Sequence, residues 1–338
     1  MEKDTYKRSP TMNINEIAKL AGVSRATVSR YLNNGYVSTQ KREAIKKVID
    51  ETGYEPSTQA QNLRKQVTKL IGVIIPRIQS ESVSRMVSGI SDVLSKEGYH
   101  LLLANTENNP YEELKYLKVF RKNQVDGIIF MGTVFSKEHF KLMEEAKVPI
   151  VVVGQQVKDY SCVYQDDYHA AYEATMTLIN KGKNIGYIGV PTKDKATGKA
   201  RFDGFVDALR AADYPILKSN MLEADFSVDS GYENAKKLME ENKDIDSIFC
   251  ATDYIAIGAL KYLESVNIKV PKEVSLIGFG NTQMGSVVTP SISSVHFFYK
   301  TSGMDAAKLM LDIINSGVDK KQSVMLGFKI VEQGSTRR

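Results

Sequence analysis

The spacing of apolar residues divides the chain into two parts with different periods. From Asn13 to Asn33, apolar residues recur three and four positions apart, as on one face of a short helix. From Leu70 onward, short continuous apolar runs alternate with stretches of helical period. The first pattern predicts a small helical domain, and the second predicts buried parallel strands connected by helices.

The first helix is predicted from its capping sequence. Asn13 followed by Glu16 is a capping box, in which each side chain satisfies a free backbone N–H of the first turn. The apolar face of this helix is predicted to hold Ile14, Ile17, Ala18, and Leu20 or Ala21. Gly22 then supplies a tight turn, which Val23 is expected to pack against.

Ser24 is a suitable cap for a second helix that turns Val28 and Leu32 inward. The residues predicted to face outward are Arg25, Ala26, Ser29 and Arg30. Arginine can bind guanine O6 and N7, serine can bind a phosphate, and alanine allows close approach to a thymine methyl group. This favours a DNA-reading helix-turn-helix over a plain two-helix packing unit with a solvated basic face.

A third helix over 39–52 is predicted to close this domain, with Ser38 as its cap and Gly53 at its end. Its apolar stripe consists of Ala44, Ile45, Val48 and Ile49. Residues 1–11 are polar and aperiodic and read as a flexible tail. Residues 57–64 could form a marginal polar helix or an ordinary linker, which composition alone does not decide.

The remainder of the chain predicts an α/β fold. The expected strands are 70–75, 101–104, 127–131, 150–153, 185–190, 247–251 and 274–279. The expected helices are 82–97, 110–123, 136–146, 168–182, 199–212, 229–241, 254–266 and 300–316. This alternation predicts two open, doubly wound parallel sheets, in which ligands bind outside the carboxyl ends of the strands.

Charge is concentrated at the N-terminus. Residues 1–69 hold 13 Lys/Arg and 7 Asp/Glu, a net +6, whereas the rest of the chain has 32 and 33, a net −1. A basic N-terminal segment followed by a nearly neutral chain indicates that phosphate binding is confined to the N-terminal domain. No run of 18 apolar residues and no signal-like N-terminus occurs, so we expect a soluble cytoplasmic protein without membrane contact, its two cysteines structural.

Enzyme motifs are missing from the sequence. There is no phosphate-binding G-x-x-x-x-G-K-[ST], no H-E-x-x-H and no C-x-x-C, and the four histidines are scattered. Asp166 and Asp167 are adjacent, but no neighbour in sequence supplies a partner for acid–base work. We therefore expect no catalytic residue, no metal site and no cofactor.

Several segments together resemble the lactose/galactose-repressor (LacI/GalR) family, from about Met12 to the C-terminus. The most specific are A-G-V-S-R-A-T-V-S-R-Y-L-N, the joint G-Y-E-P, and L-I-G-V-I-I-P at the start of the α/β part. Further matches are Q-V-D-G-I-I-F, V-P-I-V-V-V-G, R-F-D-G-F, A-D-F-S-V-D-S-G-Y, A-T-D-Y-I-A-I-G and V-S-L-I-G-F-G-N-T.

The resemblance implies a homodimer whose two headpieces read a palindromic operator. It implies a helix-turn-helix domain over 12–56, a hinge helix over 57–69, and a two-lobed core over 70–338 shaped like a periplasmic binding protein. The N-lobe would comprise about 70–167 and 297–325, and the C-lobe about 168–296 and 326–338. Because the chain lacks the leucine-heptad tail of tetrameric members, we expect a dimer.

The resemblance also implies DNA contacts. Arg25 and Ala26 match the base-reading pair, and Leu63 matches the hinge residue that wedges into the minor groove. The full predicted set is Asn13, Asn15, Ser24, Arg25, Ala26, Thr27, Ser29, Arg30, Asn33, Tyr54, Ala60 and Leu63. Ser57 departs from the family, which usually has asparagine after the proline.

For a small effector, Arg201 matches an arginine that binds ligand hydroxyls or carboxylates, and Phe226 matches an aromatic residue that stacks on the ligand. The full predicted set is Ser82, Gln155, Arg201, Phe226, Asp253 and Asn281. For Asp253 the alternative of a simple helix cap remains open.

Two departures bear on the effector's identity. Gly280 stands where many relatives have a ligand-binding aspartate, and Asn281 is expected to take part of that role. Ser82 and Val83 replace the stacking aromatics of purine-responsive relatives, which argues against a purine and favours a sugar such as a disaccharide.

The prediction is therefore a repressor of carbohydrate-utilisation genes that a sugar or sugar phosphate releases from DNA. Two alternatives remain: a global regulator controlled by a phosphocarrier protein as co-repressor, and a sugar-binding protein without a transcriptional role.

Overall fold

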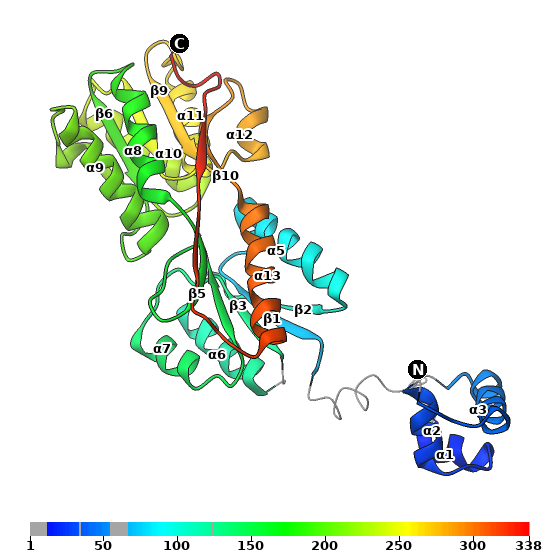
Figure 1. Ribbon diagram of the computed structural model, residues 1–338. Coiled ribbons are helices and arrows are strands. Elements are labelled where there is room, and N and C mark those ends of the chain that lie inside the picture. The colour runs from blue at the N-terminus through cyan, green and yellow to red at the C-terminus, as the bar shows by residue number, and fades with distance from the viewer. Residues whose placement is uncertain (1–11, 34, 55–66, 123–124, 338) are drawn as a thin grey trace, which may run out of the picture. The chain divides into compact units, whose positions relative to one another are not determined.

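The computed structural model describes residues 12–33, 35–54, 67–122 and 125–337 (Figure 1). The chain divides at Thr68 into two compact units, which we call the headpiece and the core. The predicted tail over 1–11 and most of the predicted hinge, including Ala60 and Leu63, lie outside the described residues.

The headpiece consists of three helices around a small apolar centre. They are α1 (Ile14–Leu20), α2 (Arg25–Leu32) and α3 (Thr39–Thr52). The capping box is present, because Asn13 Oδ1 accepts from the Glu16 amide and the Glu16 carboxylate accepts from the Asn13 amide at 2.7 Å. The buried centre is Ile17, Ala18, Val28, Val37 and Ile45. Leu20 is 59% exposed, so Ala21 takes the inner position.

One lobe of the core, the N-lobe, is built on a six-stranded parallel sheet of order β11-β5-β4-β3-β1-β2. Its strands are β1 (Leu70–Ile75), β2 (His100–Asn105), β3 (Gly127–Phe130), β4 (Ile150–Val153), β5 (Ser161–Gln165) and β11 (Ser323–Leu326). Its helices are α5 (Glu81–Leu94), α6 (Pro110–Lys122), α7 (Lys137–Glu144) and α13 (Tyr299–Ser316). Helices α5 and α13 pack on one face of the sheet, and α6 and α7 on the other.

The other lobe, the C-lobe, repeats this plan with the order β12-β10-β9-β8-β6-β7. Its strands are β6 (Ile185–Gly189), β7 (Met221–Glu223), β8 (Ser247–Cys250), β9 (Ser275–Phe279), β10 (Ser293–Phe297) and β12 (Phe328–Val331). Its helices are α8 (Asp167–Ile179), α9 (Arg201–Ala211), α10 (Val228–Glu241), α11 (Asp253–Ser265) and α12 (Gln283–Val287), with a π-helical turn over Lys195–Ala200.

The sequence pattern missed five strands, β5, β7, β10, β11 and β12. Polar residues interrupt most of these strands, as in S-S-V-H-F of β10 and F-K-I-V of β12, and β7 has only three residues, so they lack the continuous apolar run that marks a buried strand. The predicted doubly wound parallel sheets are confirmed, with one antiparallel pair at an edge. Strand β12 runs antiparallel to β10, whereas the other pairs of this sheet are parallel.

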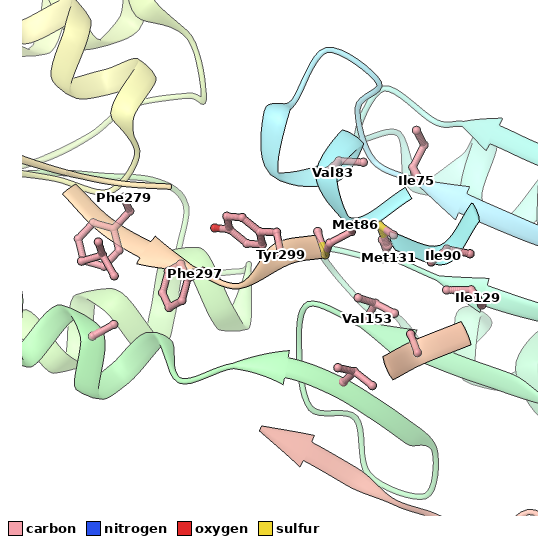
Figure 2. Packing of buried hydrophobic residues seen from close by; sticks show 14 of the residues in the cluster. Ile75, Val83, Met86, Ile90, Ile129, Met131, Val153, Phe279, Phe297 and Tyr299 are labelled. Atoms are coloured by element: carbon pink, nitrogen blue, oxygen red, sulfur yellow. The ribbon is translucent and has the colours of Figure 1, made fainter. Parts of the chain in front are cut away.

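The chain passes between the two lobes three times, after β5, after β10 and after β11. One apolar cluster is continuous across this junction. Figure 2 shows Tyr299, at the start of α13, between Phe297 of the C-lobe and Met86 and Met131 of the N-lobe. Among the described helices, none is both long and apolar enough to cross a membrane.

Candidate functional site

The headpiece displays its polar residues on the second helix. Ser24 caps α2, with its Oγ 3.3 Å from the Thr27 amide and 2.9 Å from the Thr27 hydroxyl. Arg25, Ala26 and Arg30 are exposed, whereas Val28 of the same helix is fully buried. These three residues are thus held outward because the opposite face of the helix packs into the headpiece.

The remaining described residues of the predicted DNA set are also at the surface. Asn13, Asn15, Ser24 and Asn33 are exposed, and Thr27, Ser29 and Tyr54 are partly buried. The Asn33 amide donates to the Ser29 carbonyl at 2.6 Å and so closes the end of α2. Tyr36, which the sequence analysis did not select, is 91% exposed just beyond that end.

The core encloses a cavity of about 530 Å³ that is lined by residues of both lobes. Its walls include residues at the carboxyl ends of strands, where this architecture places ligands. Of the six predicted effector residues, four line the cavity: Ser82, Gln155, Arg201 and Phe226. Asp253 and Asn281 do not belong to the lining.

Arg201 is buried against Asp167. Its Nε donates to the Asp167 carboxylate at 2.7 Å, and its Nη1 donates to the Ala251 carbonyl. Burial alone would lower the pKa of Arg201, but the Asp167 charge raises it. The fold thus brings Asp167 an ion-pair partner from 34 residues away, which the sequence analysis did not anticipate. Asp167 is a cavity residue that the sequence analysis missed.

Asp253 holds the loop that follows β9. Its Oδ2 accepts from the Thr282 amide at 2.6 Å and the Thr282 hydroxyl at 2.9 Å, and its Oδ1 accepts from Ser294 at 2.6 Å. The helix cap is Thr252, not Asp253. Both carboxylate oxygens are thus occupied by the protein, and Asp253 supports Thr282, which does line the cavity.

Asn281 is held by side chains of the C-lobe. Its amide group lies 3.2 Å from His296 Nδ1, and its carbonyl accepts from Gln333 at 3.4 Å. Its backbone has φ of 45°, the left-handed conformation that asparagine tolerates. The adjacent Gly280 lines the cavity instead.

A polar latch joins the two lobes at the cavity's edge. From α5 in the N-lobe, Arg85 donates to the carbonyls of Gly280 and Asn281 at 3.2 and 3.1 Å. The Glu81 carboxylate accepts from the Gln283 amide at 3.0 Å and also pairs with Arg85. We call Glu81, Arg85 and the backbone of 280–283 the lobe latch.

Three further charged cavity residues escaped the sequence analysis: Arg77, Glu107 and Asp194. Arg77 lies just after β1 in the N-lobe, and Asp194 begins the π-helical turn in the C-lobe. The Arg77 guanidinium lies 4.1 Å from the centre of the Phe226 ring. The sequence did contain a signal for Arg77. This residue comes just after the carboxyl end of a buried strand, and ligands bind at that end of the strands in this architecture.

Gln155 is oriented by the N-lobe backbone. Its Nε2 donates to the carbonyls of Gly132 and Thr133, which leaves its Oε1 as the atom available to a ligand. Apolar side chains complete the lining: Val83, Met86, Met131, Val153, Val228 and Phe279. Among the described residues, no three His, Cys, Asp or Glu side chains gather to hold a metal ion.

A helix-turn-helix headpiece and a separate core with a ligand-sized cavity define a DNA-binding transcriptional regulator with an effector domain. A family model described as bacterial regulatory proteins of the lacI family matches residues 13–57. A second, described as periplasmic binding proteins and sugar binding domain of the LacI family, matches residues 68–332. The chain belongs to the LacI family of bacterial transcriptional regulators, which are not enzymes.

Similar proteins match over nearly the whole chain. The sucrose operon repressor of Staphylococcus xylosus is 33% identical, covering 93% of this chain and 97% of that protein. Catabolite control protein A of Priestia megaterium is 31% identical, covering 96% and 99%. The Lac repressor dimer bound to operator and an anti-inducer shares the fold with a TM-score of 0.84, at 18% identity, covering 97% and 99%.

Proposed function

We propose that this regulator represses carbohydrate-utilisation genes and is released from a palindromic operator by a sugar or sugar phosphate. The observation that carries the proposal is the composition of the cavity. It combines charged and amide groups, which bind hydroxyls, with apolar side chains that suit the C–H face of a sugar ring. The similarity to a sucrose operon repressor supports the same class of effector.

In the headpiece, Arg25 and Ala26 are proposed to read base edges in the major groove. The other exposed polar residues of the headpiece, including Ser24, Arg30 and Asn33, would hold phosphates and fix the register. Two copies of the chain would read the two halves of the operator. The proposed hinge residues, Ala60 and Leu63, would enter the minor groove between them.

The lobe latch is the proposed link between the cavity and the DNA. Its C-lobe half, residues 280–283, includes the cavity residues Gly280 and Thr282, and Asp253 holds Thr282 in place. A ligand that contacts Thr282 would therefore act on the same loop that Glu81 and Arg85 bind. The relative angle of the lobes, and with it the spacing of the two hinges in a dimer, would change on binding.

The proposal is tested by fluorescence anisotropy of a labelled palindromic duplex taken from DNA flanking the gene. We expect specific, salt-sensitive binding that one sugar or sugar phosphate releases, with a change in affinity of roughly 5- to 150-fold. Specific binding that no sugar alters would refute the sugar-effector proposal. It would favour the alternative of a regulator controlled by a phosphocarrier co-repressor, which titration with that protein would then test.

A further inference from the structure

Arg77 and Arg201 both line the cavity, but their surroundings differ. Arg201 is engaged by the Asp167 carboxylate and the Ala251 carbonyl. Arg77 extends from the N-lobe onto the Phe226 ring of the C-lobe, and among the described residues no hydrogen bond or ion pair reaches its guanidinium. Its Nε is fully buried without any partner.

An arginine in this situation is expected to find a partner in a ligand. A guanidinium offers five N–H donors, and a buried donor without a partner costs free energy. Stacking on Phe226 uses the face of the guanidinium and leaves the edge, where the N–H groups point, free to donate. Arg77 is therefore the arginine with more donors to offer, because Arg201 already donates to Asp167 and to the Ala251 carbonyl.

The charges around Arg77 indicate what kind of group it would bind. The cavity lining holds two cations, Arg77 and Arg201, and three carboxylates, Glu107, Asp167 and Asp194. Since Arg201 and Asp167 neutralise each other, Arg77 faces an excess of negative charge. A phosphate would add like charge beside these carboxylates, whereas a hydroxyl adds none.

Asp194 is placed to receive such a hydroxyl. It is 9% exposed, and its Oδ1 accepts from the Ala196 and Thr197 amides at 3.0 and 2.9 Å. For its Oδ2 the structure describes no partner. A sugar hydroxyl both donates and accepts, so neighbouring hydroxyls can donate to Asp194 and accept from Arg77.

We propose that Arg77 and Asp194 together select an uncharged sugar over its phosphate ester, with Arg77 donating to the ring or hydroxyl oxygens and Asp194 accepting from a hydroxyl. This inference rests on the proposed function and narrows its effector class. The contacts that distinguish the sugar from its phosphate ester would then come from one residue of each lobe.

The first test is isothermal titration of the full-length protein with sucrose and cellobiose and with the 6-phosphate of each. We expect one neutral disaccharide to bind at least tenfold more tightly than its phosphate. A phosphate ester that binds as tightly or more tightly would overturn the inference while the proposed function stands. Failure of all four compounds to bind, together with no release of DNA by any other sugar or sugar phosphate, would overturn both.

The second test uses variants of the two residues. Arg77→Ala should weaken binding of the neutral disaccharide at least tenfold. Arg77→Lys, which keeps the charge but loses the planar fork, should recover only part of that loss. Asp194→Asn keeps a hydrogen-bond acceptor and removes the negative charge. It should therefore reduce the difference in affinity between the neutral disaccharide and its phosphate ester.

Arg121→Ala is the matched control, because Arg121 is exposed, pairs with Glu145 on the surface and does not line the cavity. It should leave all four affinities unchanged. Unchanged operator binding and far-UV circular dichroism will show that each variant is folded. Folded Arg77→Ala protein with undiminished affinity for the neutral disaccharide would refute the role of Arg77.

Discussion

The headpiece and the core place their functional residues in opposite ways. The described part of the headpiece has five buried apolar residues, and the side chains of Arg25, Ala26 and Arg30, which are proposed to face DNA, are exposed. The core instead encloses charged residues in its cavity and joins two of them, Arg201 and Asp167, in a buried ion pair. A substitution at an exposed headpiece residue that caps no helix, such as Arg25, should therefore change recognition alone, whereas one at Arg201 in the cavity should change binding and stability together.

The largest effect is expected for Arg201→Ala. It leaves the Asp167 carboxylate buried without its partner, and breaking a buried pair in this way costs about 3–5 kcal/mol. Chemical denaturation should show the core destabilised by that amount, with effector response lost and headpiece binding to DNA retained at low temperature. Lys115→Ala, which removes an exposed pair with Glu112, should change stability by less than about 1 kcal/mol. Unaltered core stability would contradict the structural importance of the Arg201 pair.

Ile45→Ala should act on the other unit. Ile45 is completely buried in the small centre of the headpiece, and such truncations cost about 2–5 kcal/mol. A domain of this size has little stability to spare, so we expect operator binding to be lost while calorimetric binding of the effector persists. Leu20→Ala, at an exposed position of the same unit, is the matched control and should bind the operator normally. Loss of effector binding in the Ile45 variant would show that the units do not fold independently.

The same contrast explains what the sequence could predict. The headpiece was predicted almost completely, because the Asn13–Glu16 capping box, the turn at Gly22 and the outward position of Arg25 depend on neighbours a few residues away. The cavity was predicted only in part. The pair of Arg201 with Asp167, and the contact of Arg77 with Phe226, join residues that are distant in sequence and that no local pattern connects.

Asp253 shows, at a single residue, which structural features a sequence predicts and which it does not. Its position at the start of α11 was visible in the sequence, but its role depends on Thr282 and Ser294, which reach it from two other segments. The strands that the apolar pattern did not predict were missed for a related reason. Pairing with neighbours, and not their own composition, makes segments such as β10 and β12 strands.

A smaller effect, confined to recognition, is expected for Arg25→Ala. The side chain is exposed, so headpiece stability should stay within about 0.5 kcal/mol of the parent. If Arg25 reads a base, discrimination between the operator and a duplex altered at one base pair should fall by about 1–3 kcal/mol. Anisotropy titrations with the two duplexes at fixed salt measure this difference. Equal loss on both duplexes would instead assign Arg25 to a phosphate contact.

The smallest effect is expected for Glu81→Gln in the lobe latch. The substitution weakens the hydrogen bond to the Gln283 amide and the pair with Arg85, for an expected loss of about 1 kcal/mol at this partly exposed site. Because the latch stabilises one arrangement of the lobes, weakening it favours the other arrangement, and linkage requires effector and operator affinities to shift in opposite directions. Paired titrations should show each shifted about fivefold, whereas Glu112→Gln, whose partner lies on its own helix, should shift neither. Affinities that fall together would mean that Glu81 serves only stability, and that the lobe angle is set elsewhere.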